Sequence, residues 1–599
     1  MQNYQYRRTT HKHLHQSLFH TVTLLSLTLL LSACTNEIFS EQSSLHNAKQ
    51  QSTQLKQPNI LWLVLEDMSP ILEAYGDHTV KTPNITRLAK EGVKYTQVYS
   101  PSGVCAPSRA ALATGMYPSA IGANNMRTWT YTHVTGLPKY EAVPPAEVKM
   151  LSHYMRLQGY YTTNNSKTDY QFKPPKTAWD QGGVLGHWRS RPNKNQPFFS
   201  IMNFTTTHES GLFEPYGIRH IEQRHYIAGQ TQKITALNNM RNPKKGSEAE
   251  APVHLPKDTK FTTIPPYLPD TPLVQRDFWK MYNNLAEADS QIGAVLADLE
   301  EDGLLDSTII VFYTDHGGPL PRQKRLIYDS GLKVPLIIRY PDGRYAGMTD
   351  DQLVSFIDFA PTTLAMVGAD VPKHMHGQNF INNGDKKRQY IHAAADRFDA
   401  DGDVIRAVKD KRYKYIRNYL PEKPYYLKLS YREKIPTMQE LLRLRDAGQL
   451  TKAQALWFRT SKPREELFDT WNDPHEINDI AGDPQYAEKI KELSTEMDRW
   501  LAEIGDTPDY PERQMITDMW NGGDSQPVTE APEISLKHGM VSITSKTDGA
   551  SIGYKIIQQS GKPSKSWTIY QKPFALPQGA KLEVFAHRIG YLQSDVISN

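Results

Sequence analysis

Three segments of the chain are largely apolar, at residues 60–65, 198–204 and 308–314, and the first is apolar throughout. Runs of this length without polar alternation are typical of strands buried on both faces, as in a parallel sheet. The carboxyl ends of parallel strands share one edge of the sheet, and ligands bind at that edge. The polar residues that directly follow these runs include Glu66 and Asp67, His208, and Asp315 and His316. The pattern therefore predicts a functional site at one sheet edge.

Helical spacing appears between the apolar runs. Residues 277–301 place Leu285, Ile292 and Leu299 on one helical face. Strands that alternate with helices predict an α/β fold, in which a mostly parallel sheet is flanked by helices.

The N-terminal segment has the features of an export signal. Residues 1–33 carry three basic residues, an apolar stretch at 22–31 and the small pair Ser32 and Ala33 before Cys34. The stretch is shorter than the roughly 20 residues that span a bilayer. We expect lipid transfer to Cys34 and an exported bacterial lipoprotein, anchored in the outer membrane only through its lipid and facing the periplasm or cell surface. The alternative is an ordinary signal peptide with an incidental cysteine.

The C-terminal part of the chain changes character. Residues 389–419 alternate as short strands, and residues 483–504 have the spacing of an amphipathic helix that Asp483 would cap, with Pro484 in its first turn. From about residue 530 the pattern is β-like and predicts an appended β-sandwich-like domain. The predicted parts are a signal peptide (1–33), a lipidated tether (34–57), the α/β domain that carries the site (58–388), an α+β subdomain with a small antiparallel sheet (389–515) and a small β domain (530–599).

Composition limits the possible partners. Of 69 Lys and Arg residues, three lie in residues 1–33, which leaves 66 against 65 Asp and Glu. This balance gives no basic excess and argues against a nucleic-acid partner. Any anion must then be bound locally, in a site.

The carboxylates at the strand ends point to a cation. Glu66, Asp67 and Asp315 would lie together at one sheet edge, where like charges repel unless a positive ion separates them. Oxygen ligands favour Ca²⁺ or Mg²⁺ over zinc, and several anionic ligands favour Ca²⁺. The alternative is that these residues only cap the helix or loop that follows.

Cys105 lies at a predicted helix start, because Pro107 occupies the first turn of a helical run. The positive end of a helix favours an anion there, so a thiol would be a nucleophile of lowered pKa. The alternative is a free buried cysteine that behaves as a small apolar residue.

Residues 105–109 (Cys-Ala-Pro-Ser-Arg), followed by 112–115 (Leu-Ala-Thr-Gly), resemble the signature of the type I sulfatases, whose fold is akin to alkaline phosphatase. Residues 58–67 and 82–92 resemble other stretches of that family. In this family the signature cysteine is oxidised to Cα-formylglycine. The resemblance therefore implies that Cys105 is modified, and that a maturation enzyme is a partner.

The resemblance also implies roles for individual residues. Arg109 matches the arginine that holds the formylglycine, and Lys167 and Lys324 match the sulfate-binding lysines. His208 matches the histidine beside the leaving oxygen, and we expect it to protonate the leaving alkoxide. The matched metal ligands are Glu66, Asp67, Asp315, His316 and the modified Cys105, with Ca²⁺ favoured over Mg²⁺.

Three positions depart from the family pattern. Glu66 replaces a more frequent Asp, and His316 stands where many members have Asn. Asp169 occupies a place where many members have His, which leaves more of the acid–base work to His208.

The implied activity is hydrolysis of sulfate esters on a polysaccharide or oligosaccharide, with ulvan favoured among algal glycans. Arg127 suits a uronic carboxylate. Asp169 could receive a substrate hydroxyl, and Arg397 could reach the cleft. The alternatives are a heparan or other glycosaminoglycan sulfatase, a phosphodiesterase or phosphonate monoester hydrolase of the same superfamily, and a surface glycan-binding protein if Cys105 is unmodified.

Overall fold

The computed structural model describes residues 57–227, 251–381, 387–558 and 566–598. Gln57–Asn599 form one compact unit. The predicted signal peptide, Cys34 and the tether up to residue 56 lie outside the described residues. Among the helices described, none is long and apolar enough to cross a membrane.

An eight-stranded sheet forms the centre of the α/β part, in the order β4-β3-β5-β1-β6-β7-β2-β8. Strand β7 runs antiparallel to both of its neighbours, and the other pairs are parallel. The prediction of a mostly parallel sheet is confirmed. The strands are β1 (Asn59–Leu65), β2 (Val93–Tyr99), β3 (Tyr161–Asn165), β4 (Gln181–Gly182), β5 (Phe198–Phe204), β6 (Thr308–Thr314), β7 (Lys333–Arg339) and β8 (Thr349–Ser355).

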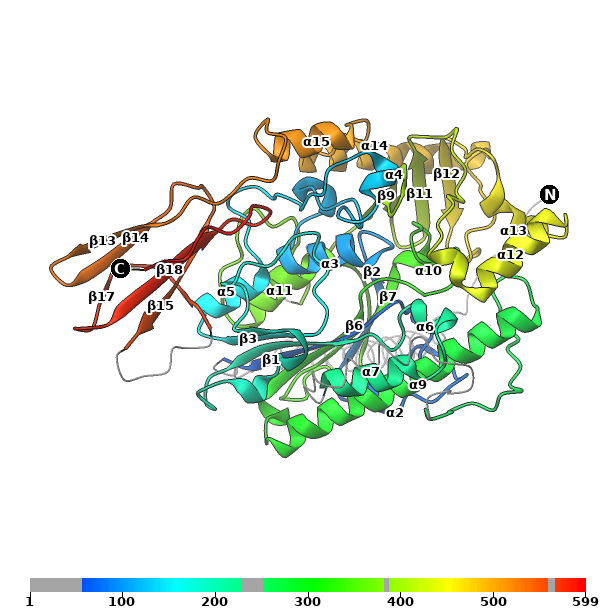
Figure 1. Cartoon of the computed structure of the whole chain (residues 1–599). Helices are drawn as coiled ribbons and strands as arrows, with labels where there is room; N and C mark the ends of the chain where they lie inside the picture. The colour runs from blue at the N-terminus through cyan, green and yellow to red at the C-terminus, as the bar shows by residue number, and fades with distance from the viewer. Residues whose placement is uncertain (1–56, 228–250, 382–386, 559–565, 599) are drawn as a thin grey trace, which may run out of the picture. The chain divides into compact units, whose positions relative to one another are not determined.

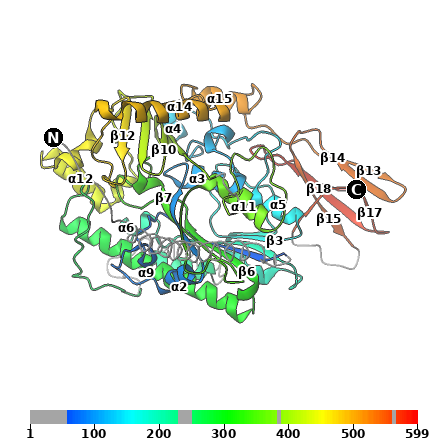
Figure 2. The ribbon, with the colours of Figure 1, turned by 180° about the vertical axis from the view of Figure 1, so that it is seen from behind.

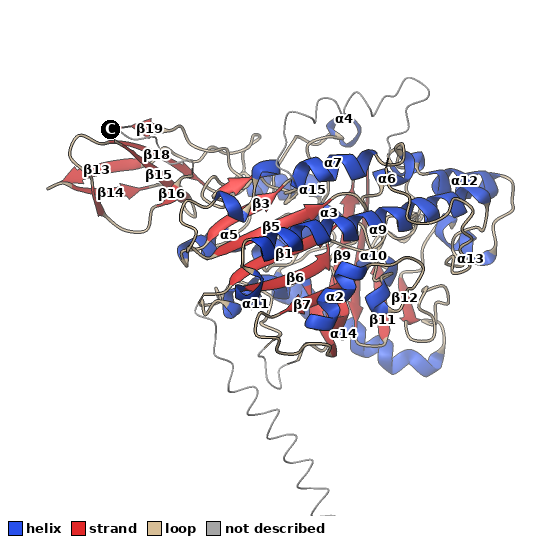
Figure 3. Cartoon of the chain, turned by 90° about the horizontal axis from the view of Figure 1, so that it is seen from below, coloured by secondary structure: helices blue, strands red, loops and turns tan. Residues whose placement is uncertain are grey.

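Helices cover both faces of this sheet (Figure 1). On one face lie α2 (Pro83–Glu91), α7 (Ile218–Ile227) and α9 (Pro272–Glu301), which Figure 3 shows in front of the strands. On the other face lie α3 (Cys105–Thr114), α5 (Leu151–Leu157) and α11 (Phe359–Met366).

Strand β1 shows why its sequence lacks polar alternation. Leu63 packs in the same core cluster as Leu285 of α9. The neighbouring Trp62 points to the opposite face, where its ring meets Phe359 of α11 edge-on at 6.0 Å. Because helices bury both faces, apolar residues are needed at every position.

A second, antiparallel sheet follows, with strand order β12-β11-β10-β9. Helix α14 (Ala487–Ile504) packs on it, because Met497 and Trp500 lie in one apolar cluster with Val408 and Tyr415 of the sheet. Figure 2 shows the helix beside this sheet from behind. Asp483 caps the short 3₁₀ turn Pro484–Tyr486 that precedes α14. The strands are β9 (Ile391–Phe398), β10 (Asp401–Lys409), β11 (Tyr413–Asn418) and β12 (Glu465–Asp469), and the nearby helices are α12 (Pro436–Asp446), α13 (Lys452–Ala455) and α15 (Glu512–Met519).

Two small antiparallel sheets end the chain, in the orders β13-β14-β17 and β16-β15-β18-β19. Val541 and Ile543 of one sheet pack with Leu582 and Val584 of the other, which makes a sandwich-like core. The strands are β13 (Glu533–Lys537), β14 (Met540–Thr544), β15 (Ser551–Ile557), β16 (Thr568–Ile569), β17 (Phe574–Ala575), β18 (Lys581–His587) and β19 (Ile597–Ser598).

Candidate active site

The predicted site lies at the carboxyl ends of β1 and β6. These strands are neighbours, and their register pairs Leu65 with Thr314, so the residues that follow them leave the sheet at the same level. The backbone N–H of Asp67 donates to Asp315 Oδ1 at 3.1 Å. Asp67 itself has a left-handed backbone, with φ of 48°, which turns the chain at the strand end.

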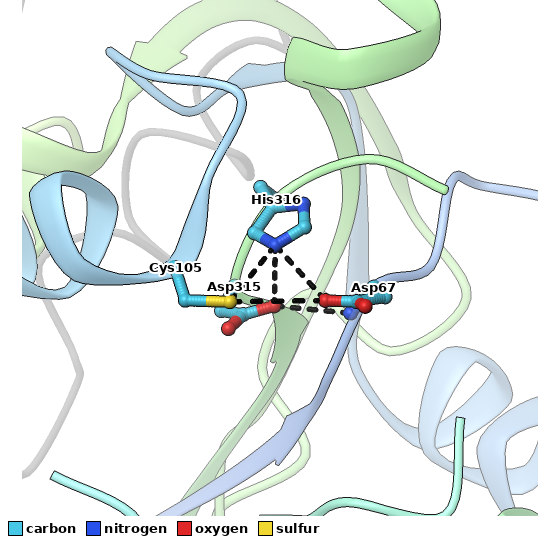
Figure 4. A group of neighbouring side chains, drawn as sticks. All are labelled: Asp67, Cys105, Asp315 and His316. Atoms are coloured by element: carbon cyan, nitrogen blue, oxygen red, sulfur yellow. Dashed lines mark hydrogen bonds and ion pairs between the residues drawn. The ribbon is translucent and has the colours of Figure 1, made fainter. Parts of the chain in front are cut away.

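Cys105 reaches this sheet edge from helix α3. It is the first residue of α3 and is 1% exposed. Its Sγ lies 3.3 Å from His316 Nε2 and 3.9 Å from Asp67 Oδ1. One potential ligand atom from each of Asp67, Cys105, Asp315 and His316 lies within 4.8 Å of the others, and all four side chains are buried (Figure 4).

Arg109 lies one helical turn after Cys105 and neutralises part of this edge. Its Nε donates to Asp315 Oδ2 at 3.0 Å, and its Nη1 donates to Asn203 Oδ1 at 2.7 Å. Glu66 Oε1 lies 3.6 Å from Arg109 Nη2. Burial opposes the charge, but the two carboxylates outweigh it and raise the pKa of Arg109, so the guanidinium stays charged.

The two predicted sulfate-binding lysines lie against acidic side chains. Lys324 Nζ is 2.7 Å from Asp67 Oδ2 and 3.3 Å from Glu209 Oε1. Burial would favour a neutral amine, but Asp67 raises the pKa of Lys324 well above its ordinary value. Lys167 Nζ contacts the carboxylate of Glu66 and lies 3.5 Å from Asp169 Oδ2.

His208 is held beside these charges. Its Nδ1 is 2.8 Å from Ser210 Oγ, at the start of α6 (Ser210–Phe213). Burial first, and then the charge of Lys324, lower the pKa of His208 well below its ordinary value. The imidazole is therefore neutral at pH 7 in the substrate-free protein.

The three predicted substrate residues lie at different depths. Arg127 has a side chain 27% exposed, pairs with Asp399 at 2.7 Å and lies 5.4 Å from the ring of Tyr431. Asp169 has a side chain 26% exposed beside Lys167. Arg397 pairs with Glu512 of α15 at 2.7 Å and donates to the Asp399 carbonyl, so its charge is already paired within the protein.

Several site residues were missed by sequence reasoning. Glu209 and Arg325 form a two-pronged ion pair, with both distances 2.9 Å, directly beside the lysine and histidine of the site. Their only sequence signal is adjacency, since Glu209 follows His208 and Arg325 follows Lys324. Asp399 lies two residues after the predicted Arg397, in the loop between β9 and β10 of the second sheet, and its pairing with Arg325 has no signal in the sequence.

A divalent cation suits the donors at this edge. Asp67 and Asp315 supply two carboxylates, His316 supplies a nitrogen, and position 105 faces all three. Carboxylate oxygens are the ligands that hard cations such as Ca²⁺ and Mg²⁺ prefer. The carboxylate of Glu66 faces Lys167 and Arg109 beside the group. The residues present therefore fit a divalent metal.

The chain matches two protein-family models and is similar to a known enzyme. Residues 58–188 and 183–369 match the sulfatase family model, and residues 322–453 match the N-sulphoglucosamine sulphohydrolase C-terminal model. An ulvan-active sulfatase of Formosa agariphila is 58% identical over 555 residues, which cover 92% of each chain.

Solved structures show the same fold. A 2-O GAG sulfatase superposes with a TM-score of 0.51 at 18% identity, covering 75% of this chain and 93% of its own. A phosphonate monoester hydrolase of Silicibacter pomeroyi gives 0.50 at 17% identity, covering 82% and 100%. At these identities the likeness concerns the fold alone.

The class that the fold and the site define is a hydrolase with the alkaline phosphatase-like fold. Within that class the chain belongs to the sulfatase family, whose members generally use a formylglycine and a divalent metal. It is a sulfuric ester hydrolase.

Proposed function

We propose that this sulfatase removes sulfate from ulvan, or from oligosaccharides released from it, with Ca²⁺ and a formylglycine at position 105. The observation that supports this most is the burial of Cys105 at the start of α3, 3.3 Å from His316 and beside Asp67. The relative that is 58% identical is ulvan-active, which supports the substrate.

Two groups complete the proposed site. Glu66, Asp67, Asp315, His316 and residue 105 would hold the calcium ion. The ion supplies positive charge against the sulfate oxygens. The formylglycine hydrate supplies an oxygen nucleophile with a second hydroxyl.

The basic residues of the chain would bind and orient the sulfate. Arg109 is itself held by its bonds to Asp315 and Asn203, and from one turn along α3 it would hold the modified residue 105. Lys167 and Lys324 now neutralise Glu66 and Asp67. When a cation takes over those carboxylates, the two ammonium groups can turn their hydrogen bonds toward sulfate oxygens and stabilise the charge that develops on them.

His208 would protonate the leaving sugar oxygen. In the substrate-free protein its pKa is held low by burial and by Lys324. A bound sulfate ester carries negative charge into the same space, which favours the imidazolium form. His208 would take this proton from solvent and give it to the sugar oxygen as the sulfur–oxygen bond breaks. General acid catalysis of this kind contributes about 10²–10⁴-fold.

The substrate is proposed to meet two further residues, with a third supporting them from behind. The partly exposed Arg127 would bind a carboxylate of a neighbouring sugar, and Asp169 would accept a hydroxyl. Arg397, paired with Glu512, would stiffen the cleft wall behind Asp399.

Maturation and location form part of the same proposal. A formylglycine-installing enzyme converts Cys105, and the chain is exported as a lipoprotein attached through Cys34 to the outer membrane. The boundaries of the parts are those predicted from the sequence. The proposed metal- and sulfate-binding residues lie within residues 58–388, and Arg397 and Asp399 come from the subdomain that follows.

A glycosaminoglycan sulfatase is the second candidate, because residues 322–453 match the N-sulphoglucosamine sulphohydrolase C-terminal model. The discriminating experiment measures sulfate release from defined ulvan, heparan and chondroitin oligosaccharides, beside an aryl phosphodiester. We expect the highest kcat/KM on ulvan fragments. Preference for heparan fragments would favour the second candidate, and preference for the phosphodiester would reject both.

The modification needs its own measurement. Mass spectrometry of the peptide that contains residue 105 should show formylglycine in protein purified from its native host. An unmodified thiol in fully active protein would reject the proposed nucleophile.

A further inference from the structure

A continuous series of ion pairs runs from Lys324 to Arg127, a partly exposed residue that is taken as the rim of the site. Glu209 Oε1 lies 3.3 Å from Lys324 Nζ, and both of its oxygens accept from Arg325 at 2.9 Å. Arg325 Nε then donates to Asp399 Oδ2 at 2.7 Å. The other oxygen of Asp399 lies 2.7 Å from Arg127 Nε, at the rim. These five residues are called the charge chain below.

The middle of the charge chain is buried. Arg325 is 5% exposed, and Glu209 and Asp399 are 0% exposed. Desolvating three charged groups costs several kcal/mol each before their pairing is counted. Arg325 and Asp399 also have left-handed backbones, with φ of 73° and 72°, and such strain costs about 1–3 kcal/mol per residue. Apolar residues would fill this space without the desolvation cost, so the arrangement indicates a functional role.

Arg325 also touches the loop that leads to Cys105. Its backbone N–H donates to the Gly103 carbonyl at 2.6 Å. A Cβ at Gly103 would lie 2.2 Å from the Leu326 carbonyl oxygen, so this close approach requires glycine. Arg325 therefore contacts a segment two residues from the nucleophile position and is itself next to Lys324.

We propose that Arg325 is a positioning residue that holds the ammonium of Lys324 in place for sulfate and links it, through Asp399, to Arg127 at the rim. This inference rests on the proposed sulfate-binding role of Lys324.

The physical reason lies in Glu209. Its carboxylate is the second anion beside Lys324, after Asp67. If Arg325 did not hold both oxygens of Glu209, that carboxylate would be free to draw the ammonium away from a bound sulfate. A planar guanidinium can hold both oxygens at once, whereas the single ammonium of a lysine cannot.

The test measures binding of inorganic sulfate, the reaction product, to the mature calcium-loaded protein by calorimetry. Arg325→Lys keeps the charge but removes the two-pronged geometry, and should weaken sulfate binding about tenfold, a coupling typical of contacting residues. In a Lys324→Ala background the same change should alter sulfate affinity less than threefold, because the lysine through which Arg325 acts is gone.

The matched control is Arg499→Lys. Arg499 is also ion-paired, with Glu496 at 2.6 Å, but lies on α14 with a side chain 55% exposed. We expect its sulfate affinity to equal that of the parent protein. A merely structural role for Arg325 would lower the unfolding temperature and leave sulfate affinity dependent on Arg325 even without Lys324.

Two results overturn the positioning role: sulfate affinity of Arg325→Lys within threefold of the parent, or an equal loss in both backgrounds. If Arg325→Lys does not fold, Asp399→Asn loosens Arg325 from its other side and is judged by the same criteria. A parent that binds no sulfate overturns the role of Lys324 and the inference together. A parent that binds sulfate but does not act on ulvan refutes only the substrate assignment.

Discussion

The acidic sheet edge and the C-terminal sandwich bury opposite kinds of side chain. At the edge, Asp67, Asp315 and Lys324 are at most 2% exposed, with Asp67 neutralised by Lys324 and Asp315 by Arg109. In the sandwich, Val541 and Leu582 are fully buried in an apolar cluster. Apolar burial stabilises a fold at about 25 cal/mol per Å², whereas a buried ion pair gives little net stability. The apolar core of the sandwich should therefore determine the stability of that domain. The residues of the sheet edge should determine catalytic activity and contribute little net stability.

The largest expected effect comes from Cys105→Ala. Without the modified side chain no nucleophile remains, so sulfate release should fall at least about 10⁴-fold, by analogy with removal of other catalytic nucleophiles. The side chain is small and adds little to packing, so the unfolding temperature should stay close to that of the parent. Steady-state sulfate release and differential scanning calorimetry measure the two quantities. Substantial residual turnover would contradict the assignment.

Removal of divalent metal should rank second. Chelation would leave Asp67 and Asp315 beside each other with only internal cations to offset them. We expect activity to fall about 10²–10³-fold, and the unfolding temperature to fall as well, since a ligand that binds only the folded state stabilises it. Ca²⁺ should restore both quantities better than Mg²⁺. Full activity after exhaustive chelation, verified by elemental analysis, would reject the metal.

Lys324→Ala should lower kcat/KM about 10²–10³-fold, because it removes a charge aimed at the sulfate oxygens. Lys411, which is 47% exposed and paired with Asp351, offers a matched control. Its replacement by alanine should leave kcat/KM on ulvan fragments within about twofold of the parent. Equal losses in the two variants would remove the distinction between the edge and an ordinary surface ion pair.

Leu582→Ala tests the sandwich side of the comparison. The side chain is fully buried between the two small sheets, so its truncation should lower the free energy of unfolding of that domain by about 2–5 kcal/mol. Sulfate release below the transition should remain within twofold of the parent. Denaturant unfolding followed by activity and by fluorescence separates the domains. Loss of activity in step with the sandwich would show that the two regions unfold as one.

The smallest effect concerns Glu466 of β12. Burial raises its pKa to about 7, although the Tyr425 hydroxyl, 2.8 Å away, works against the shift. The folded state thus holds a proton that the unfolded state has lost, and stability falls as pH rises from about 4.5 to 7. The full difference corresponds to about 3 kcal/mol.

Glu466→Gln should remove this pH dependence while keeping an acceptor for Tyr425. Urea unfolding at pH 5 and pH 8 measures it, with the neighbouring Glu465→Gln as the control that retains the parent slope. Parallel pH profiles for parent and Glu466→Gln would contradict the expectation.

Strand ends were predictable because burial on both faces leaves few polar residues within a strand, so the charged residues that follow it stand out in the sequence. The fold prediction is confirmed, and the edge brings Asp67, Cys105, Asp315 and His316 together. The start of α9 was placed five residues late, since its first turn, from Pro272, does not repeat the apolar spacing. The roles assigned to the individual site residues stay predictions.

The charge chain was not predictable from sequence patterns. Glu209, Arg325 and Asp399 come from three separate segments of the chain, and they form ion pairs only because the fold brings these segments together. Single charged residues in loops are ordinarily solvated, so the sequence gives no reason to bury them. Only the tertiary contacts reveal the pairing.

The burial of Cys105 also sets an order of events in the life of the protein. The Cys105 thiol lies at the start of α3 against His316, with 1% of the residue exposed. In the folded protein it is therefore inaccessible to the active site of another enzyme. The proposed oxidation must therefore precede folding, while residues 105–109 are still an extended peptide. A chain that folds first would be trapped as a stable but permanently inactive product.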